Sequence, residues 1–148
     1  MGRNIIILPG DTPDMRYTQL EHTADAMVRC TGSTLEECFA NAAYALSDQT
    51  VDADKVERRL ALDIEASGED LEERLFNFLS EVLYLQDAET FAFADFDVRF
   101  DGDRVIGKGY GEPLDVKKHH AKGEVKAVTY HMMEVDPDIP QVTVVFDM

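Results

Sequence analysis

Two adjoining stretches decide the fold class: DLEERLFNFLSEVLYL at 70–85 and FAFADFDVRFDGDRVIGKGY at 91–110. In the first, apolar residues recur every three or four positions, which predicts a well-buried helix. Asp70 with Glu73 supplies the capping box at its start. In the second, apolar residues alternate, but the alternation changes phase at Ala94-Asp95. A strand cannot otherwise change faces, so this stretch predicts strands with a bulge or a break at Ala94-Asp95.

The remaining segments show the same two patterns, apolar residues at helical spacing or in alternation along a strand. Ser33 with Glu36 predicts the start of another helix, whose apolar stripe continues to Leu46. Strands are expected at Ala26–Cys30, Val56–Ala66, about Val125–Val135 and Gln141–Asp147, with a short strand or arm within Met1–Asp14 and a hairpin turn at Asp101-Gly102-Asp103. The predicted order is strand, strand, helix, strand, helix and four strands. It defines an α+β fold, with two helices packed on a largely antiparallel or mixed sheet.

Composition limits the partners of this chain. Its 148 residues are enough for one domain, which we place at 17–148 after an N-terminal arm at 1–16. A net charge of −16 repels phosphate backbones, so tight direct binding of nucleic acid is not expected. Cations or a basic protein surface are the expected partners. The alternative is that the acidity serves solubility alone.

The cysteines and the apolar segments indicate the compartment. Cys30 and Cys38 have neither a CxxC nor any other zinc-type spacing, so we expect a reduced, cytoplasmic protein. No apolar run is long enough for a membrane span, and no membrane association is expected. Gly107, Gly109 and Gly111 lack the spacing of a phosphate loop, and close packing of another element against the strand is the favoured interpretation.

Charged residues interrupt strand-like sequence near both ends of the chain. Glu21-His22-Thr23-Ala24-Asp25 lies near the start, and near the end Glu124 flanks a strand, expected from about Val125, that contains Lys126. Charges in such places usually need a partner or a function. For Lys126 there are two interpretations. It protects an edge strand from aggregation, or it presents a cation to a nucleotide phosphate or a partner's carboxylate.

The last residues add a possible metal site. Asp147 stands beside Met148, whose α-carboxylate is expected to lie next to the aspartate side chain. Together with Asp25 these groups would offer hard oxygen ligands that suit Ca²⁺ or Mg²⁺ and not zinc. The alternative is that Asp25 is a turn residue and Asp147 a solvated strand end.

Several separated motifs resemble those of the archease family, in the same order and over nearly all of the chain from Tyr17 onward. They are Leu20-Glu21-His22-Thr23-Ala24-Asp25, Thr34-Leu35-Glu36-Glu37, Phe78-Leu79 with Glu81, Gly111-Glu112-Pro113, Glu124 to His131, and Asp147. The resemblance implies a two-layer α+β fold with duplicated strand–helix–strand–strand units. It also implies a protein cofactor, not an enzyme, that activates the RtcB-type tRNA-splicing ligase by promoting its guanylylation and turnover.

The same resemblance assigns residues. It implies a divalent metal, which is calcium in the family, bound by Asp25, Asp147 and Met148, and a functional role for Lys126. We expect His22 and Glu124, in the same motifs, to contact the partner or the nucleotide. Two alternatives remain open: a chaperone-like module that tunes an RNA-modifying methyltransferase, and a metal-dependent hydrolase. Against the hydrolase, the sequence contains no recognisable nucleophile or general base beyond the possible metal ligands.

Overall fold

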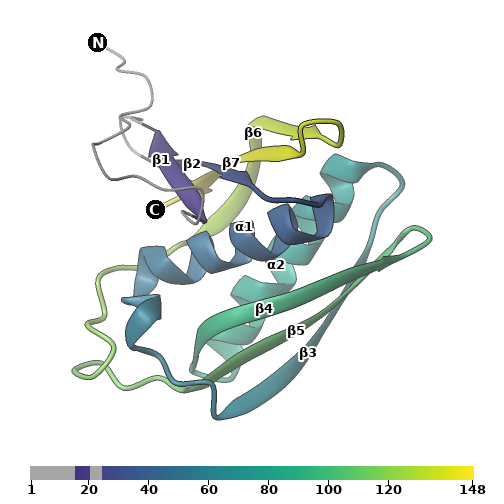
Figure 1. Ribbon diagram of the computed structural model, residues 1–148. Helices are drawn as coiled ribbons and strands as arrows, with labels where there is room; N and C mark the ends of the chain where they lie inside the picture. The colour runs from purple at the N-terminus through teal and green to yellow at the C-terminus, as the bar shows by residue number, and fades with distance from the viewer. Residues whose placement is uncertain (1–15, 21–24) are drawn as a thin grey trace.

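A computed structural model describes residues 16–20 and 25–148 of the chain. Seven strands and two helices make up this part of the molecule (Figure 1). In chain order they are β1 (Tyr17–Leu20), β2 (Ala26–Thr31), α1 (Leu35–Thr50), the 3-10 turn η1 (Ala53–Lys55), β3 (Leu60–Ser67), α2 (Leu71–Ala88), β4 (Phe91–Asp101), β5 (Arg104–Pro113), β6 (Ala127–Asp136) and β7 (Gln141–Asp147). From Ala26 onward this is the predicted order. Strand β1 is additional, and the strand expected within Met1–Asp14 lies outside the described residues.

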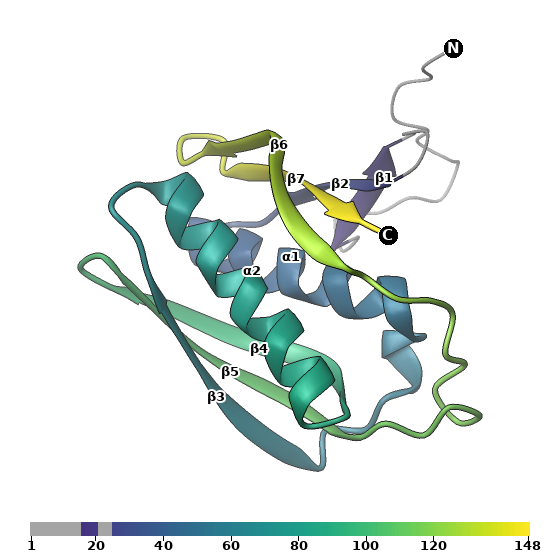
Figure 2. The same cartoon turned by 180° about the vertical axis from the view of Figure 1, so that it is seen from behind.

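The strands form two separate antiparallel sheets, ordered β1-β2-β7-β6 and β3-β5-β4. Both helices lie between the sheets, as the two opposite views show (Figures 1 and 2). The α+β class with two helices is therefore confirmed. The layering differs from the expected two layers on one sheet, because each helix packs against strands of both sheets.

The helices are buried broadly because they have a sheet on either side. In α1 the fully buried positions include Phe39, Ala42, Ala43 and Leu46, and the small alanines let the neighbouring strands approach closely. In α2 the buried residues Leu75, Phe78, Leu79, Val82 and Leu83 cover more than one narrow stripe. Together with inward-facing residues of both sheets, these side chains form the main hydrophobic core.

Both helices begin with a reciprocal cap. In α2, Asp70 accepts a hydrogen bond from the backbone N–H of Glu73 at 2.7 Å, as predicted. In α1 the cap is Thr34, which accepts from the N–H of Glu37 at 3.1 Å. The predicted pair of Ser33 and Glu36 is wrong by one residue. Two adjacent hydroxyl residues and two adjacent glutamates made both registers plausible from the sequence.

The β3-β5-β4 sheet confirms three local predictions. The pairing of β4 with β5 shifts between Phe93 and Asp95, at the predicted bulge. The two strands are joined at Gly102, whose φ of +63° is the left-handed conformation that favours glycine. A Cβ at Gly107 would come within 2.9 Å of the Phe78 ring. This glycine therefore allows helix α2 to pack closely on the sheet.

The expected duplication is present, with one unit inserted into the other. The inserted unit consists of β3, α2, β4 and β5, and its sheet order is β3-β5-β4. The terminal unit consists of β2, α1, β6 and β7, and its strands are ordered β2-β7-β6. In each unit a strand leads to a helix, a hairpin follows, and the last strand lies in the centre. The inserted unit enters the chain between α1 and β6.

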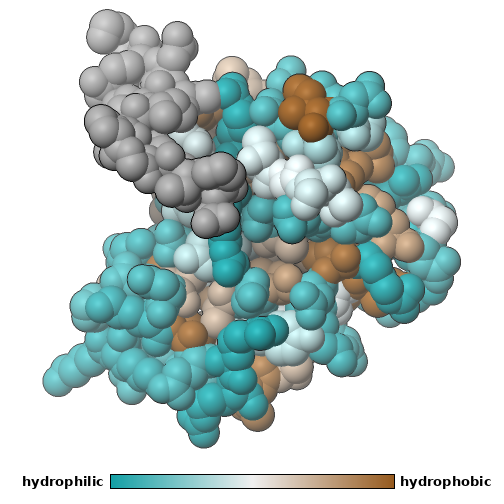
Figure 3. All heavy atoms as spheres, viewed as in Figure 1, coloured by the Kyte–Doolittle hydropathy of each residue, from teal (hydrophilic) through white to brown (hydrophobic). Residues whose placement is uncertain are grey.

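The surface agrees with the acidic composition. Most of the face in Figure 3 is hydrophilic, consistent with a net charge of −16. No helix in the described part of the chain is both long and apolar enough to cross a membrane.

Candidate functional site

The predicted site residues at the two ends of the chain meet at one end of the four-stranded sheet. Strand β2 begins at Ala26, opposite Phe146, and β6 begins at Ala127, opposite Asp147. Continuing the first register by one residue places Asp25 opposite Asp147. In Figure 2 the end of the chain lies beside the point at which β6 begins. The central strand β7 therefore brings together segments that are more than a hundred residues apart in sequence.

The alternation of side chains decides which groups face outward. Ala26 and Phe146 are buried in the core, so the next positions, Asp25 and Asp147, lie on the opposite side of the sheet. Asp147 is exposed and Asp25 partly exposed. The carboxylate of Asp147 forms no ion pair or hydrogen bond with another residue in the part of the chain that the structure describes. The sheet thus presents two adjacent carboxylates at its surface.

Lys126 lies at the same end, one residue before β6. Its backbone N–H donates to the carbonyl oxygen of Asp147 at 2.7 Å, and Val125 beside it is buried. The strand was predicted to start at Val125, so Lys126 lies just outside it rather than within it. The main chain of Lys126 is fixed to β7, while its side chain is exposed. Among residues 16–20 and 25–148 no carboxylate pairs with its ammonium group.

Met148 follows Asp147 and is partly buried. Its side chain packs against the hydrophobic core, which fixes the main chain beyond Asp147. The oxygens of Asp25, Asp147 and the Met148 main chain are hard donors of the kind that Ca²⁺ accepts. The described residues contain no group of three or more His, Cys, Asp and Glu side chains suited to a metal ion. A cation held here would have few protein ligands.

The other predicted contacts are placed differently. Glu124 is exposed and lines a separate hollow of about 210 Å³, together with residues of the α1 and α2 ends such as Val51 and Gln86. His22, like the Glu21–Ala24 segment to which it belongs, lies outside the described residues.

A second charged cluster, centred on Glu112, was missed by the sequence analysis. Glu112 is buried, and His119, also buried, bonds to it through Nε2 at 2.9 Å. Lys118 lies 3.0 Å from the same carboxylate, Arg59 lies 3.4 Å from it, and the N–H of Glu57 donates to it at 2.9 Å. We call these five residues the Glu112 cluster.

The hydrogen bonds around the Glu112 cluster define its electrostatics. The bond from Glu57, with those from His119, Lys118 and Arg59, lowers the pKa of Glu112 to about 2 despite the opposing effect of burial. The N–H of Asp115 donates to Nδ1 of His119 at 3.0 Å, so Nε2 carries the proton that bonds Glu112. Every charge here is satisfied internally. The cluster anchors the loop that leads from β5 towards Lys126. The carboxylate in the strand sequence Gly111-Glu112-Pro113 was a signal of this cluster that the sequence offered.

The arrangement defines an α+β protein with a polar site built at the end of a sheet, outside the core. Comparison with known proteins then gives the family. Residues 17–148 match the archease protein family (MTH1598/TM1083), and the chain belongs to that family.

The relatives cover most of the chain. The protein archease of Pyrococcus furiosus is 47% identical over 125 residues, which are 82% of this chain and 88% of that protein. The protein archease of Methanopyrus kandleri is 40% identical over 126 residues, 82% of this chain and 90% of that one.

Two solved structures share the fold. The solution structure of Methanobacterium thermoautotrophicum protein 1598 has a TM-score of 0.78 and 31% identity, over 90% of this chain and 99% of that one. The crystal structure of a Thermotoga maritima archease, described as a possible chaperone, has a TM-score of 0.58 over 87% of this chain and 94% of that one. Its 22% identity supports the fold alone.

Proposed function

We propose that this chain is a protein cofactor that activates an RtcB-type RNA ligase by promoting guanylylation of the ligase, without ligating RNA itself. The observation that carries the proposal is the meeting of Asp25, Asp147 and Lys126 at one end of the four-stranded sheet. Both signs of charge are presented there on a rigid strand end. Such a surface is suited to enter a partner's active site and orient charged groups in it.

Lys126 would contribute the positive charge. Its backbone is held by Asp147 at 2.7 Å, so the position of the residue is set by the sheet and not by a loose loop. Its ammonium group has no carboxylate partner among the described residues and keeps its capacity for three hydrogen bonds. We infer that it contacts either a phosphate of the nucleotide or a carboxylate of the ligase.

Asp25, Asp147 and the main-chain oxygen of Met148 would hold a divalent cation, with Ca²⁺ as the expected ion. Two carboxylates on adjacent strands repel each other, and a hard cation relieves this repulsion. A bound cation would supply positive charge at the sheet end, with coordination positions left for water or a partner's group. The contribution of the protein is to fix the oxygens through the pairing of β2, β7 and β6.

The charge of the chain supports a protein partner over RNA. A net charge of −16 gives no favourable release of counterions on contact with phosphates, so binding of RNA by the isolated protein should be weak. The same charge favours fast association with a basic protein surface. RNA would therefore be held by the ligase and not by this chain.

The test is to mix the ligase with GTP, divalent metal and limiting amounts of this protein, and to follow covalent GMP on the ligase. We expect faster guanylylation with the wild-type protein and no ligation by the protein alone. Equal rates with and without the protein would remove the proposal.

Lys126→Ala should remove the stimulation while leaving unfolding almost unchanged, because an exposed lysine contributes little to stability. Lys117→Ala is the matched control. Lys117 is also exposed and has no ion pair among the described residues, but it lies in the loop before β6 and not at the sheet end. If both variants stimulate the ligase fully, Lys126 is not part of the site.

A further inference from the structure

Tyr130, on β6, is an exposed aromatic ring held in a fixed orientation. It stacks on Phe76 of α2 with 4.1 Å between the ring centroids and only 4° between the planes. Tyr130 nevertheless remains 52% exposed. One face of its ring is therefore covered by Phe76, and the other is open to solvent. An open ring face with a fixed partner behind it is an available stacking platform.

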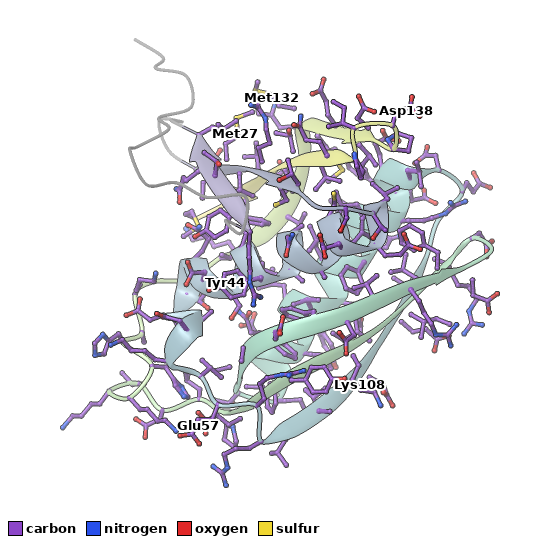
Figure 4. The ribbon with its side chains drawn as sticks, in the orientation of Figure 1. Met27, Tyr44, Glu57, Lys108, Met132 and Asp138 are labelled. Carbon is purple, nitrogen blue, oxygen red and sulfur yellow. The ribbon has the colours of Figure 1, made fainter. Side chains whose placement is uncertain are left out.

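The backbone around Tyr130 is irregular. The pairing of β6 with β7 is interrupted between Thr129 and Glu134. Within the interruption Met132 has a φ of +55°, a conformation that is costly for a residue with a Cβ. Met132 stands at the outer side of the four-stranded sheet, away from the helices (Figure 4). Bulges of this kind redirect side chains, and such strain is concentrated at functional positions.

The surroundings of the ring are acidic. Glu73 lies one helical turn before Phe76 on α2, and Asp70 is the N-cap of the same helix. Burial raises the pKa of Tyr130, and the carboxylates of Glu73 and Asp70 raise it further. Each also serves in the cap of α2: Asp70 accepts from the N–H of Glu73, and Glu73 accepts from the N–H of Glu69 at 2.8 Å. Neither forms an ion pair within residues 16–20 and 25–148. Their negative charge is therefore not neutralised by the described part of the chain.

We propose that Tyr130, Asp70 and Glu73 form a recognition surface for an arginine in a basic segment of the partner ligase. A guanidinium group stacks on an aromatic face, and its planar donors can also reach carboxylate oxygens beside the ring. A lysine offers no plane to stack. An RNA base would also stack on a tyrosine, but the adjacent carboxylates would repel its phosphates.

The position of this surface fits one partner that covers both sites. Tyr130 and Lys126 are four residues apart along the start of β6, which corresponds to roughly 13 Å of extended strand. Strand β6 lies at one edge of its sheet, so within the described residues no further strand pairs with its outer side and a partner can approach along it. The inference rests on the proposed function. It adds a docking contact away from the groups that would act at the ligase active site.

The test measures the dissociation constant of the full chain for the purified ligase, by calorimetry at two salt concentrations. Tyr130→Ala should weaken binding by about tenfold or more, as expected for an aromatic anchor. The double variant Asp70→Asn with Glu73→Gln keeps both capping hydrogen bonds and removes the two charges. It should weaken binding by about threefold or more, mostly at low salt.

Two controls separate stacking from general surface effects. Tyr130→Phe keeps the ring and should bind within about twofold of wild type. Tyr84→Ala removes another exposed tyrosine, on α2, which has no stacked partner among the described residues, and should also bind within about twofold. Thermal unfolding checks that each variant is folded. If Tyr130→Ala unfolds, the affinity of the Asp70→Asn, Glu73→Gln double variant for the ligase tests the proposal instead.

The outcomes distinguish the two proposals. Wild-type binding with unchanged affinity in Tyr130→Ala and in the double variant would overturn the arginine surface and leave the proposed function intact. Failure of the wild-type protein to bind the ligase would overturn both. Loss of RNA binding instead of ligase binding in Tyr130→Ala would show that the ring stacks on a base, which also contradicts the inference.

Discussion

The terminal and inserted units have the same topology, but the carboxylates at the ends of their central strands have opposite environments. Strand β2 starts with Ala26 opposite Phe146, and β3 starts with Leu60 opposite Gly111. Asp147 and Glu112, the next residues on the two central strands, therefore occupy corresponding positions. Each is a carboxylate opposite the first residues of a hairpin strand. One is exposed and unpaired within the described residues, whereas the other is buried among its own cations.

The neighbours of the two carboxylates explain the difference. Across the strand, Asp147 faces the position of Asp25, so that two negative charges meet. Glu112 faces the position of Arg59, and the loop from β5 adds Lys118 and His119. A carboxylate whose charge is satisfied internally serves stability. A carboxylate beside a second one can accept a cation from outside, and this contrast supports placing the proposed function in the terminal unit.

The largest contrast should be in stability. Glu112→Ala leaves buried His119, Arg59 and the N–H of Glu57 without their acceptor, and removing one partner of a buried ionic cluster costs on the order of 3 kcal/mol. Asp147→Ala at the corresponding position should change the free energy of unfolding by less than about 0.5 kcal/mol. Urea unfolding of the two variants measures both values. Equal destabilisation would break the comparison.

The loss of stability at acid pH should depend on the inserted unit. The pKa of Glu112 is lowered to about 2 from an ordinary value of 4.5. The folded state therefore binds this proton at a lower pH than the unfolded state does. Its contribution to stability is complete above about pH 4.5 and is lost as the pH falls towards about 2. Glu112→Gln should unfold with a weaker dependence on pH across this window, measured by urea titrations at several pH values. An unchanged dependence would show that other carboxylates dominate.

The affinity for divalent cations should depend on residues of the terminal unit. Asp25→Ala and Asp147→Ala should each weaken Ca²⁺ binding by about tenfold or more, because each removes one of few protein ligands. Glu112→Gln is the matched control in the inserted unit and should leave the affinity unchanged. Calorimetry makes the comparison. Unchanged affinity in both aspartate variants would remove the metal site from this end of the sheet.

The smallest effect should be shared by the two units. Thr34 and Asp70 cap their helices in the same way, each accepting from the N–H three residues on. Thr34→Ala and Asp70→Ala should therefore both cost about 1 kcal/mol in denaturant unfolding. A large difference between them would mean that the two helices do not contribute equally to the fold.

Local patterns predicted the elements but not their division into two sheets. The helix at 70–85, the bulge at Ala94-Asp95 and the hairpin at Gly102 are encoded over a few residues. The pairing of β2 with β7 joins segments more than a hundred residues apart, and no local period encodes it. The broad apolar surface of α2, with Phe76 and Leu83 beside the main stripe, was the available sign that sheets lie on both sides.

The candidate site shows the same limit. Asp25, Asp147 and Lys126 were selected because charges interrupt strand-like sequence, and the β2-β7-β6 pairing brings their backbones together. The Glu112 cluster depends on an irregular loop, in which the turn at Asp115 directs His119 inward. Periodicity does not describe such a loop, so the histidine gave no signal of its own.

The most direct test of the account is the rate of ligase guanylylation with Asp147→Asn, compared with Asp138→Asn. Both variants remove one exposed carboxylate charge from the same sheet, but Asp138 lies in the turn between β6 and β7, at the opposite end (Figure 4). We predict that Asp147→Asn loses the stimulation of the ligase, with its free energy of unfolding unchanged, and that Asp138→Asn retains it. Full stimulation by folded Asp147→Asn would contradict the assignment of function to this end of the sheet.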